Sequence, residues 1–332
     1  MTKPTIVDIA DALGITPSTV SRALAGNPNV KESTRKSVLQ KADELGYQRN
    51  VIASSFRKGV TNTIGVVVPR IDREFFSKII GAAEFRLNAA GYSVVICQTR
   101  EKAANERKAL KMLSSIRVAG IMISHSSEAG TEDALVEALS GGAKLVQFDR
   151  VYAGLPGSTV ENDDFNGGYA ATKHLIDNGY KRIGAINGLQ TTIAYQNRYK
   201  GYLAALADSG IPSDGSIVFP DSIVRENGFT SAGFAIDRGC DALYCTGDFS
   251  AFGAMECALS RGLRIPEDFG IVGTANEGFT ALVTPSLSSV DQHADELGDK
   301  SARAMLNLLN GREEPEHIIV GTTFIPRRSS SR

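Results

Sequence analysis

The spacing of hydrophobic positions near the start of the chain predicts two short helices joined by a tight turn. Apolar residues recur at the i, i+3, i+4 and i+7 positions of one helix face, at Ile6, Ile9, Ala10 and Leu13. Gly14 supplies the turn, because a residue without Cβ adopts positive φ without strain. Thr16 followed by Pro17 is a helix start signal, and the second helix then points Val20 and Leu24 inward.

A third amphipathic segment completes this region. It runs from about Glu32 to Leu45, carries Val38, Ala42 and Leu45 on its apolar side, and stops at Gly46. Three such helices make a minimal hydrophobic core, so the pattern predicts an all-α helix-turn-helix domain over residues 1–49. A small helical hairpin without any ligand is the alternative, because the helix-turn-helix pattern alone is weak evidence.

The outward face of the second predicted helix suits the major groove of DNA. It carries small, uncharged residues together with Arg22, whose guanidinium offers a fork to guanine. Residues 1–60 hold nine Lys and Arg against five Asp and Glu, a net charge of +4; the rest of the chain holds 27 basic and 32 acidic residues, a net charge of −5. A basic head on an acidic body indicates that the head binds the phosphate backbone of a nucleic acid.

Residues 50–60 are expected to form a linker with a short hinge helix. Asn50 caps one or two turns that cover about residues 51–57, and Gly59 ends them. So short a helix is unstable alone in water, so it would order against DNA and melt away from it. Phe56 is either a wedge inserted between base steps from the minor groove or a side chain packed on the body.

The body, residues 61–332, alternates short β-branched runs with helical stretches, which predicts an α/β fold with parallel sheets. The expected strands are 63–69, 93–98, 120–124, 144–148, 182–186, 242–246 and 270–273, and expected helices include 75–90, 105–115, 167–178, 198–209 and 250–261. Ile64-Gly65 recurs as Ile183-Gly184, 119 residues later, and Gly91 recurs as Gly210. This echo favours two similar lobes over one large sheet.

Ligands of open parallel sheets bind outside the carboxyl ends of the strands, so two facing lobes would place a site in the cleft between them. The strand ends and following loops carry carboxylates, amides, arginines and aromatic rings, which suit a small polyhydroxylated ligand. They include Arg70, Asp72, Phe75, Phe76, Ser124, His125, Asp149, Arg150, Asn162, Asp163, Tyr195, Arg198, Asp248, Asn276 and Glu277. Individually, a residue of this kind more often caps a helix or faces solvent than touches a ligand.

Composition narrows the class of protein. At 332 residues, 42% hydrophobic and 22% charged, the chain reads as a globular protein of two or three domains. It has no run of 18 apolar residues and no signal segment, so we expect a cytoplasmic protein without membrane contact. The cysteines (Cys97, Cys240, Cys245, Cys257) read as buried free thiols, and the scattered histidines (His125, His174, His293, His317) predict no metal site. No cofactor is expected.

Taken together, these segments resemble the LacI/GalR family of bacterial transcription regulators over essentially the whole chain. The resemblance rests on residues 8–10, 14–16, 18–24 and 45–47 of the head, and on residues 64–69, 163–168, 171–175, 198–202 and 285–292 of the body. It implies a homodimer of periplasmic-binding-protein-like cores that binds palindromic double-stranded operator DNA under the control of a small-molecule effector, a sugar or sugar derivative. The implied first lobe spans about residues 61–161 and 291–322, and the second about 162–290 and 323–332.

The resemblance also assigns roles to residues. Those at base-reading positions are Pro17, Ser18 and Arg22; those at backbone-contacting positions are Thr5, Thr16, Thr19, Ser21, Asn29, Thr34 and Tyr47; those at hinge positions are Asn50, Ala53 and Phe56. Arg198 matches the arginine that commonly grips the effector, and Asp149, Asp248 and Gln292 match other cleft positions. Phe75, Phe76 and Asn276, taken from the strand ends, complete the candidate effector set.

Two departures from the family pattern stand out. Arg49 replaces a frequent proline at the entry to the hinge, and Ala275 stands where an aspartate commonly accepts a sugar hydroxyl. Either Asn276 or Glu277 takes over that role, or the effector class differs. The chain carries no C-terminal leucine heptad, so a dimer is expected rather than a coiled-coil tetramer.

The favoured function is therefore an effector-responsive transcriptional regulator, acting as a repressor of a carbohydrate-utilisation operon. A sugar-binding solute receptor without a DNA role is the alternative, and the basic helical head argues against it. An enzyme is not expected, because the sequence has no nucleophile elbow, no GxxxxGK phosphate loop and no paired carboxylates at catalytic spacing.

Overall fold

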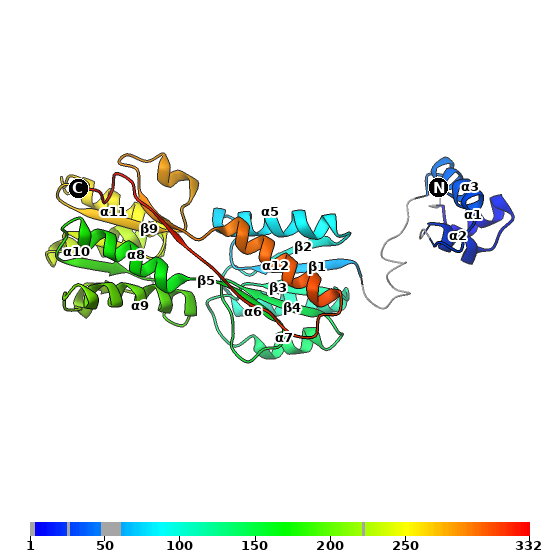
Figure 1. Ribbon diagram of the computed structural model, residues 1–332, viewed down its shortest axis with the longest axis horizontal. Coiled ribbons are helices and arrows are strands. Elements are labelled where there is room, and N and C mark those ends of the chain that lie inside the picture. Colours follow the sequence, from blue (N-terminus) through cyan, green and yellow to red (C-terminus); the bar gives the residue numbers. More distant parts are fainter. Residues whose placement is uncertain (1–3, 25–26, 48–60, 221–222) are drawn as a thin grey trace. The chain divides into compact units, whose positions relative to one another are not determined.

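The computed structural model describes residues 4–24, 27–47, 61–220 and 223–332. The chain divides into two units, Met1–Gly59 and Val60–Arg332, which we call the head and the core. The hinge predictions for Asn50, Ala53 and Phe56 lie outside the described residues. The head is all-α and the core is a two-lobed α/β fold, which confirms the predicted fold class (Figure 1).

The head has the helices α1 (Ile6–Leu13), α2 (Pro17–Leu24) and α3 (Glu32–Glu44). Thr5 caps α1 by accepting hydrogen bonds from the backbone N–H groups of Val7 and Asp8, and the Asp8 carboxylate accepts one from the Thr5 N–H. Gly14 follows with φ of 62°, the left-handed turn that its sequence position predicts. A small hydrophobic core joins the three helices. Its buried residues are Ile9, Ala10, Val20, Ala23, Val38 and Ala42.

Two positions in the head differ from the expected pattern. Leu45 lies beyond the end of α3 and is 39% exposed, so it contributes less to the core than Val38 and Ala42. Ala23 rather than Leu24 is the second fully buried residue of α2. The small alanine allows the helices of so small a core to approach closely, which hydrophobicity alone does not predict.

The first lobe of the core is a sheet with the order β11-β5-β4-β3-β1-β2, in which every neighbouring pair is parallel. Its strands are β1 (Thr63–Val68), β2 (Ser93–Gln98), β3 (Gly120–Ile123), β4 (Lys144–Phe148), β5 (Ser158–Asn162) and β11 (His317–Val320). Alternate residues of β1 face opposite sides. Val66 and Val68 pack under α5 (Glu74–Ala89) and α12 (Ala294–Leu309), and Val67 under α6 (Ala103–Ser115) and α7 (Glu132–Leu139) (Figure 1).

The second lobe repeats this plan with the order β12-β10-β9-β8-β6-β7, parallel except for β12 against β10. Its strands are β6 (Ile183–Ile186), β7 (Val218–Phe219), β8 (Ala242–Cys245), β9 (Gly270–Thr274), β10 (Ser288–Asp291) and β12 (Thr323–Ile325). The helices α8 (Asp164–Asp177) and α9 (Ile193–Asp208) pack over one face, and α10 (Arg225–Asp237) and α11 (Asp248–Ser260) over the other.

Close backbone packing between α8 and α9 fixes the start of α9. A Cβ on Gly168 would lie 2.1 Å from the carbonyl oxygen of Arg198, and one on Gly201 would lie 2.1 Å from the carbonyl oxygen of Phe165. Both glycines therefore allow a helix contact that any larger residue would push apart. This contact positions Arg198 beside the carboxyl end of β8 in the second sheet, where it meets Thr246.

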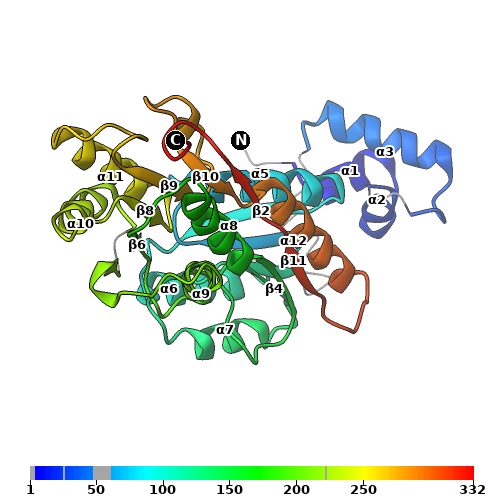
Figure 2. The same cartoon turned by 60° about the vertical axis from the view of Figure 1, so that its left-hand side comes forward.

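Among the described residues, the chain passes between the lobes from β5 to α8, from β10 to α12 and from β11 to β12 (Figure 1 and Figure 2). Hydrogen bonds tie these passages together: the Asn162 amide donates to the Gln292 carbonyl oxygen at 2.6 Å, and the Asp163 N–H donates to the Val320 carbonyl oxygen at 2.8 Å. No helix in the described part of the chain is long and apolar enough to cross a membrane.

Candidate functional site

A cavity of about 320 Å³ lies between the two lobes of the core, at the carboxyl ends of strands from both sheets. Six of the seven candidate effector residues line it, namely Phe75, Phe76, Asp149, Arg198, Asp248 and Gln292. Arg70, Arg150, Tyr195 and Glu277, which the sequence placed near strand ends, line it too. The topology therefore brings together residues that are up to about 220 positions apart in the sequence.

Arg198 is held rigidly at the wall of this cavity. Its Nε donates to Asp164 Oδ1 at 2.7 Å and its Nη1 donates to the carbonyl oxygen of Thr246 at 2.9 Å. Burial raises the pKa of Asp164 to about 6, although the charge of Arg198 opposes the rise. Because two sides of the guanidinium are fixed, its orientation toward the cavity is set before any ligand arrives.

Asp149 follows β4 directly and is buried. Its Oδ2 accepts a hydrogen bond from Ser124 Oγ at 2.9 Å, and the Arg150 Nε lies 3.8 Å from the same oxygen. Burial raises the pKa of Asp149, against the charges of Arg150 and Arg198. Arg150 is itself held by Glu101, whose Oε2 accepts from Nη1 at 2.7 Å. This wall of the cavity offers both acceptors and donors to a hydroxylated ligand.

Asp248 has both carboxylate oxygens engaged inside the second lobe. Oδ1 accepts from Ser289 Oγ at 2.7 Å, and Oδ2 accepts from the backbone N–H of Glu277 at 2.8 Å. Burial raises the pKa of Asp248 to about 7. The carboxyl group passes so close to β9 that a Cβ on Gly273 would lie 2.1 Å from Oδ1. Asp248 therefore anchors the loop after β9 as well as lining the cavity.

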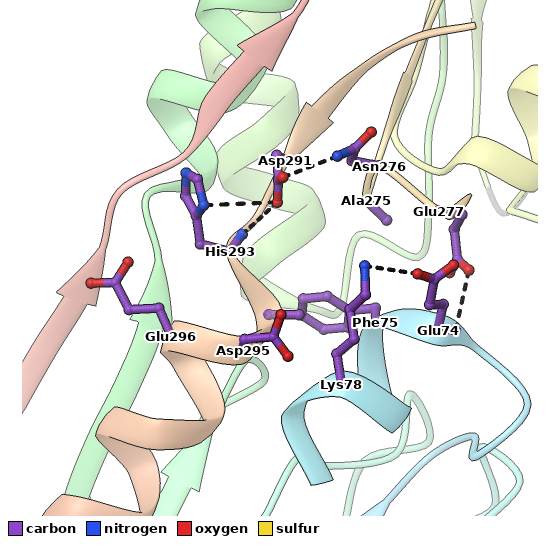
Figure 3. A pocket seen from close by; sticks show the side chains of 11 residues that line it. Glu74, Phe75, Lys78, Ala275, Asn276, Glu277, Asp291, His293, Asp295 and Glu296 are labelled. Atoms are coloured by element: carbon purple, nitrogen blue, oxygen red, sulfur yellow. Dashed lines mark hydrogen bonds and ion pairs between the residues drawn. The ribbon is translucent and has the colours of Figure 1, made fainter. Parts of the chain in front are cut away.

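Asn276 is the one candidate effector residue that does not line this cavity. Its Nδ2 donates to Asp291 Oδ2 at 3.0 Å, and its Oδ1 accepts from Arg327 Nη2 at 2.7 Å. The amide is thus turned toward β10 and the C-terminal segment, where it borders a separate pocket of about 220 Å³ (Figure 3). Of the two replacements considered for the missing aspartate, only Glu277 faces the larger cavity.

Glu277 and Glu74 join the two lobes beside the smaller pocket, which both of them line (Figure 3). Glu277 also lines the larger cavity. The Glu74 N–H donates to Glu277 Oε2 at 3.1 Å, and the Gly278 N–H donates to Glu74 Oε2 at 2.5 Å. Lys78 Nζ lies 2.7 Å from Glu74 Oε1. Burial raises the pKa of Glu277, whereas Lys78 chiefly lowers that of Glu74. We call this reciprocal pair of hydrogen bonds the lobe bracket.

The sequence interpretation missed Arg73 and Phe249, which meet across the cavity. The Arg73 guanidinium carbon of the first lobe lies 3.6 Å from the centroid of the Phe249 ring on α11 of the second lobe. Arg73 occupies the N-cap position of α5, between Asp72 and Phe75, which are both predicted strand-end residues. Its place in the loop between β1 and α5 is the signal that could have identified it.

Other strand-end residues have structural roles instead. His125 is buried, with Nδ1 2.9 Å from Glu106 Oε1 and Nε2 3.0 Å from Gln147 Oε1. Asp72 pairs with Arg70, and Asn162 and Asp163 bind the passages between the lobes. In the described part of the chain, no group of three or more His, Cys, Asp or Glu side chains is placed to hold a metal ion.

In the head, the predicted DNA-contacting residues cluster at the N-terminal end of α2 and on its outward face. Thr16, Pro17, Ser18 and Arg22 are exposed, and Thr19 and Ser21 are partly exposed. Arg22 Nε donates to the Ser18 carbonyl oxygen at 3.3 Å, a weak contact that leaves the rest of its guanidinium open. Thr5 and Asn29 are exposed, whereas Thr34 and Tyr47 are partly buried.

Comparison with known proteins accounts for both units. Residues 5–50 match the model of bacterial regulatory proteins of the lacI family, and residues 61–328 match that of periplasmic binding proteins and the sugar binding domain of the LacI family. The chain belongs to the LacI family. It is accordingly a transcription regulator with a helix-turn-helix head and an effector-binding core, as the sequence predicts.

Full-length relatives share this organisation. The LacI-family regulator DegA of Bacillus subtilis is 30% identical over 332 residues, which cover 99% of this chain and 98% of DegA. The solved complex of the regulator CelR with cellobiose is 27% identical with a TM-score of 0.74, over 98% of this chain and 99% of CelR. The lac repressor dimer bound to operator and the anti-inducer ONPF, at 22% identity, shares the fold over 100% of both chains with a TM-score of 0.88.

Proposed function

We propose that this LacI-family regulator binds a palindromic operator as a homodimer and represses a carbohydrate-utilisation operon until a small effector enters the interlobe cavity. The observation that carries the proposal is the cavity itself. It is lined from both lobes by donors, acceptors and aromatic rings, among them Arg198, Asp149 and Phe76. Rings that stack on the apolar faces of a sugar and polar groups that bracket its hydroxyls are the usual means of holding such a ligand.

The cavity also offers a means of control. Because its walls belong to different lobes, a ligand that contacts both favours one lobe arrangement over another. The lobe bracket and the contact of Arg73 with Phe249 belong to the arrangement seen here. Effector and operator then act on the same equilibrium, and each changes the affinity of the other by the same factor. The CelR complex with cellobiose supports a sugar or sugar derivative as effector.

The test is operator binding by the full chain with and without effector. Promoter fragments from the parent genome should be retained in a gel shift, and a sugar that raises the Tm of the protein should alter that retention. Arg22→Ala should abolish selective binding while leaving the ligand-induced Tm shift intact, because Arg22 lies on the exposed face of α2. Arg303→Ala, which removes an exposed arginine from α12 of the core, is the matched control.

A second variant tests the cavity. Arg198→Ala should leave operator binding in place and make it insensitive to the effector, since it removes donors that face the cavity. Removing Arg198 leaves the buried Asp164 without its partner, so the fold of the variant must be checked. Circular dichroism distinguishes a folded variant that has lost the response from a misfolded one. A folded variant that still responds at the same effector concentration would contradict the assignment of the cavity.

A further inference from the structure

Arg73 differs from the other arginines of the interlobe cavity in having no anionic partner among the described residues. Arg70 is paired with Asp72, Arg150 with Glu101 and Arg198 with Asp164. Within the described residues, no carboxylate forms a hydrogen bond or ion pair with the Arg73 side chain, which is partly buried and stacks on Phe249. A partly buried cation without a counter-charge is unusual, because burial without pairing costs free energy.

The surroundings of Arg73 compensate its charge only in part. Burial and the neighbouring Arg70 lower the pKa of Arg73, against smaller opposing effects of Asp72, Glu277 and Tyr195. By contrast, the pKa of Arg70 is raised, chiefly by its hydrogen bonds to Asp72. Glu277 is a poor counter-ion, since burial raises its pKa and its Oε2 already accepts the Glu74 N–H. Among the described residues, Arg73 is therefore the cavity arginine that no carboxylate pairs with directly.

The stacking geometry leaves the donors of Arg73 available. Phe249 occupies a face of the planar guanidinium, with the guanidinium carbon 3.6 Å from the ring centroid. The N–H groups of a guanidinium lie in its plane, so its edge stays open to a planar or tetrahedral anion. An anion bound there would form charge-assisted, bidentate hydrogen bonds in a partly desolvated site, where such bonds are strong.

We propose that the effector is an acidic sugar of about monosaccharide size, whose carboxylate or phosphate pairs with Arg73 while its hydroxyl groups contact Asp149 and Arg198. The proposal rests on the proposed function and names the ligand class of the same cavity. The cavity volume of about 320 Å³ is near the lower end for small-molecule sites, which favours a small ligand. The replacement of the usual sugar-binding aspartate by Ala275 fits this class, because it removes a negative charge from the cavity lining.

Binding of an acid would also favour the lobe arrangement seen here. Arg73 comes from the first lobe and Phe249 from the second, so an anion that fixes the guanidinium also fixes a contact between the lobes. A neutral sugar would gain nothing from Arg73 beyond ordinary hydrogen bonds. The two ligand classes therefore differ in their dependence on this one side chain.

The test compares matched sugars on the full-length protein by isothermal titration calorimetry. Each set holds a neutral sugar, its uronate and its 6-phosphate: glucose, glucuronate and glucose 6-phosphate, and the corresponding galactose compounds. At least one acid should bind at least about tenfold more tightly than its neutral parent. Added NaCl should weaken the binding of the acid more than the binding of the neutral parent. The uronate and phosphate members show which anionic group the site prefers.

Arg73→Gln should bring the ratio of acid to neutral affinities close to one, and Arg73→Lys should restore it in part, since lysine keeps the charge without the planar fork. Arg86→Gln removes an arginine from the same helix outside the cavity and should leave the ratio unchanged. Equal affinity for neutral and acidic members, no binding by any member, or an unchanged ratio in Arg73→Gln would each overturn the proposal.

These outcomes are distinguishable from failure of the proposed function. A neutral sugar that binds in the cavity and releases the operator would overturn the acidic ligand alone. An acid that binds through Arg73 but leaves operator binding unchanged would overturn effector control while supporting the ligand class. Gel shifts with the same sugars at saturating concentration make this separation.

Discussion

Burial, rather than a neighbouring charge, sets the pKa of the Asp248 carboxyl group. The residue is 1% exposed, and its pKa is raised from a usual value of 3.8 to about 7. The hydrogen bonds from Ser289 and Glu277 oppose the rise without cancelling it. Since one pKa unit corresponds to about 1.4 kcal/mol, keeping this carboxylate ionised in the folded core costs on the order of 4 kcal/mol.

The first prediction follows at this residue. Between about pH 4 and pH 7, folded Asp248 binds more protons than unfolded Asp248, so its contribution to the free energy of unfolding falls as pH rises. Asp248→Asn removes this titration, while the amide oxygen accepts the Glu277 N–H and the amide nitrogen donates to Ser289. Urea unfolding at pH 5 and pH 8 should show a smaller loss of stability in the variant than in the wild type. An equal loss would contradict the shift.

Asn276 shows where inference from single residues fails. Its place after β9 made it a reasonable candidate, because strand ends face the cleft. Its direction is set by Arg327 and Asp291, which lie 51 and 15 positions further along the chain. No local pattern reports partners at that separation. Arg73, by contrast, was within reach of the same reasoning, since it lies in the loop after β1, between the predicted strand-end residues Asp72 and Phe75.

At the scale of elements, long and strongly patterned segments could be predicted from the sequence. The buried runs of β1, β3 and β4 and the helices α5, α6, α8 and α11 lie within three residues of where hydrophobic periodicity placed them, and α9 begins five residues earlier than predicted. The strands β5, β7, β10, β11 and β12 were missed. They are short, and four of them, β5, β10, β11 and β12, carry polar or exposed positions. All five lie at or next to the edge of a sheet, or link the lobes. Their pairing partners supply what their own residues lack.

The contact between α8 and α9 yields a second prediction. Gly201→Ala adds a methyl group 2.1 Å from the Phe165 carbonyl oxygen, so the helices must separate and Arg198, one turn earlier on α9, must shift. The variant should lose roughly 1–3 kcal/mol of stability and bind effector more weakly. Gly81→Ala is the matched control: its Cβ meets nothing within 4 Å on α5, so it should be neutral or stabilising by about 0.5–1 kcal/mol. Denaturant midpoints of both variants decide the point.

At the scale of the whole molecule, each lobe buries its own core, and the sites depend on how the lobes meet. The lobe cores share no residue, whereas the larger cavity, the lobe bracket and the contact of Arg73 with Phe249 all span the two. A change at these contacts can therefore alter the equilibrium between lobe arrangements without unfolding either lobe.

The lobe bracket gives the last prediction. Glu74→Ala removes the acceptor of the Gly278 N–H, a partly exposed contact that belongs to the arrangement seen here. If the effector prefers this arrangement, a variant that populates the arrangement less binds the effector more weakly. The apparent affinity falls by the same factor as the population of the arrangement. We expect about a three- to tenfold higher effector concentration at half-maximal operator response, with an unchanged plateau, because the cavity lining stays intact. Glu84→Ala, on the same helix but bound only to Asn88 among the described residues, should leave the response curve in place. Superimposable curves for the wild type, Glu74→Ala and Glu84→Ala would show that the lobe bracket does not bias the lobe arrangement. A lower plateau for Glu74→Ala would show instead that Glu74 helps to transmit effector binding to the head.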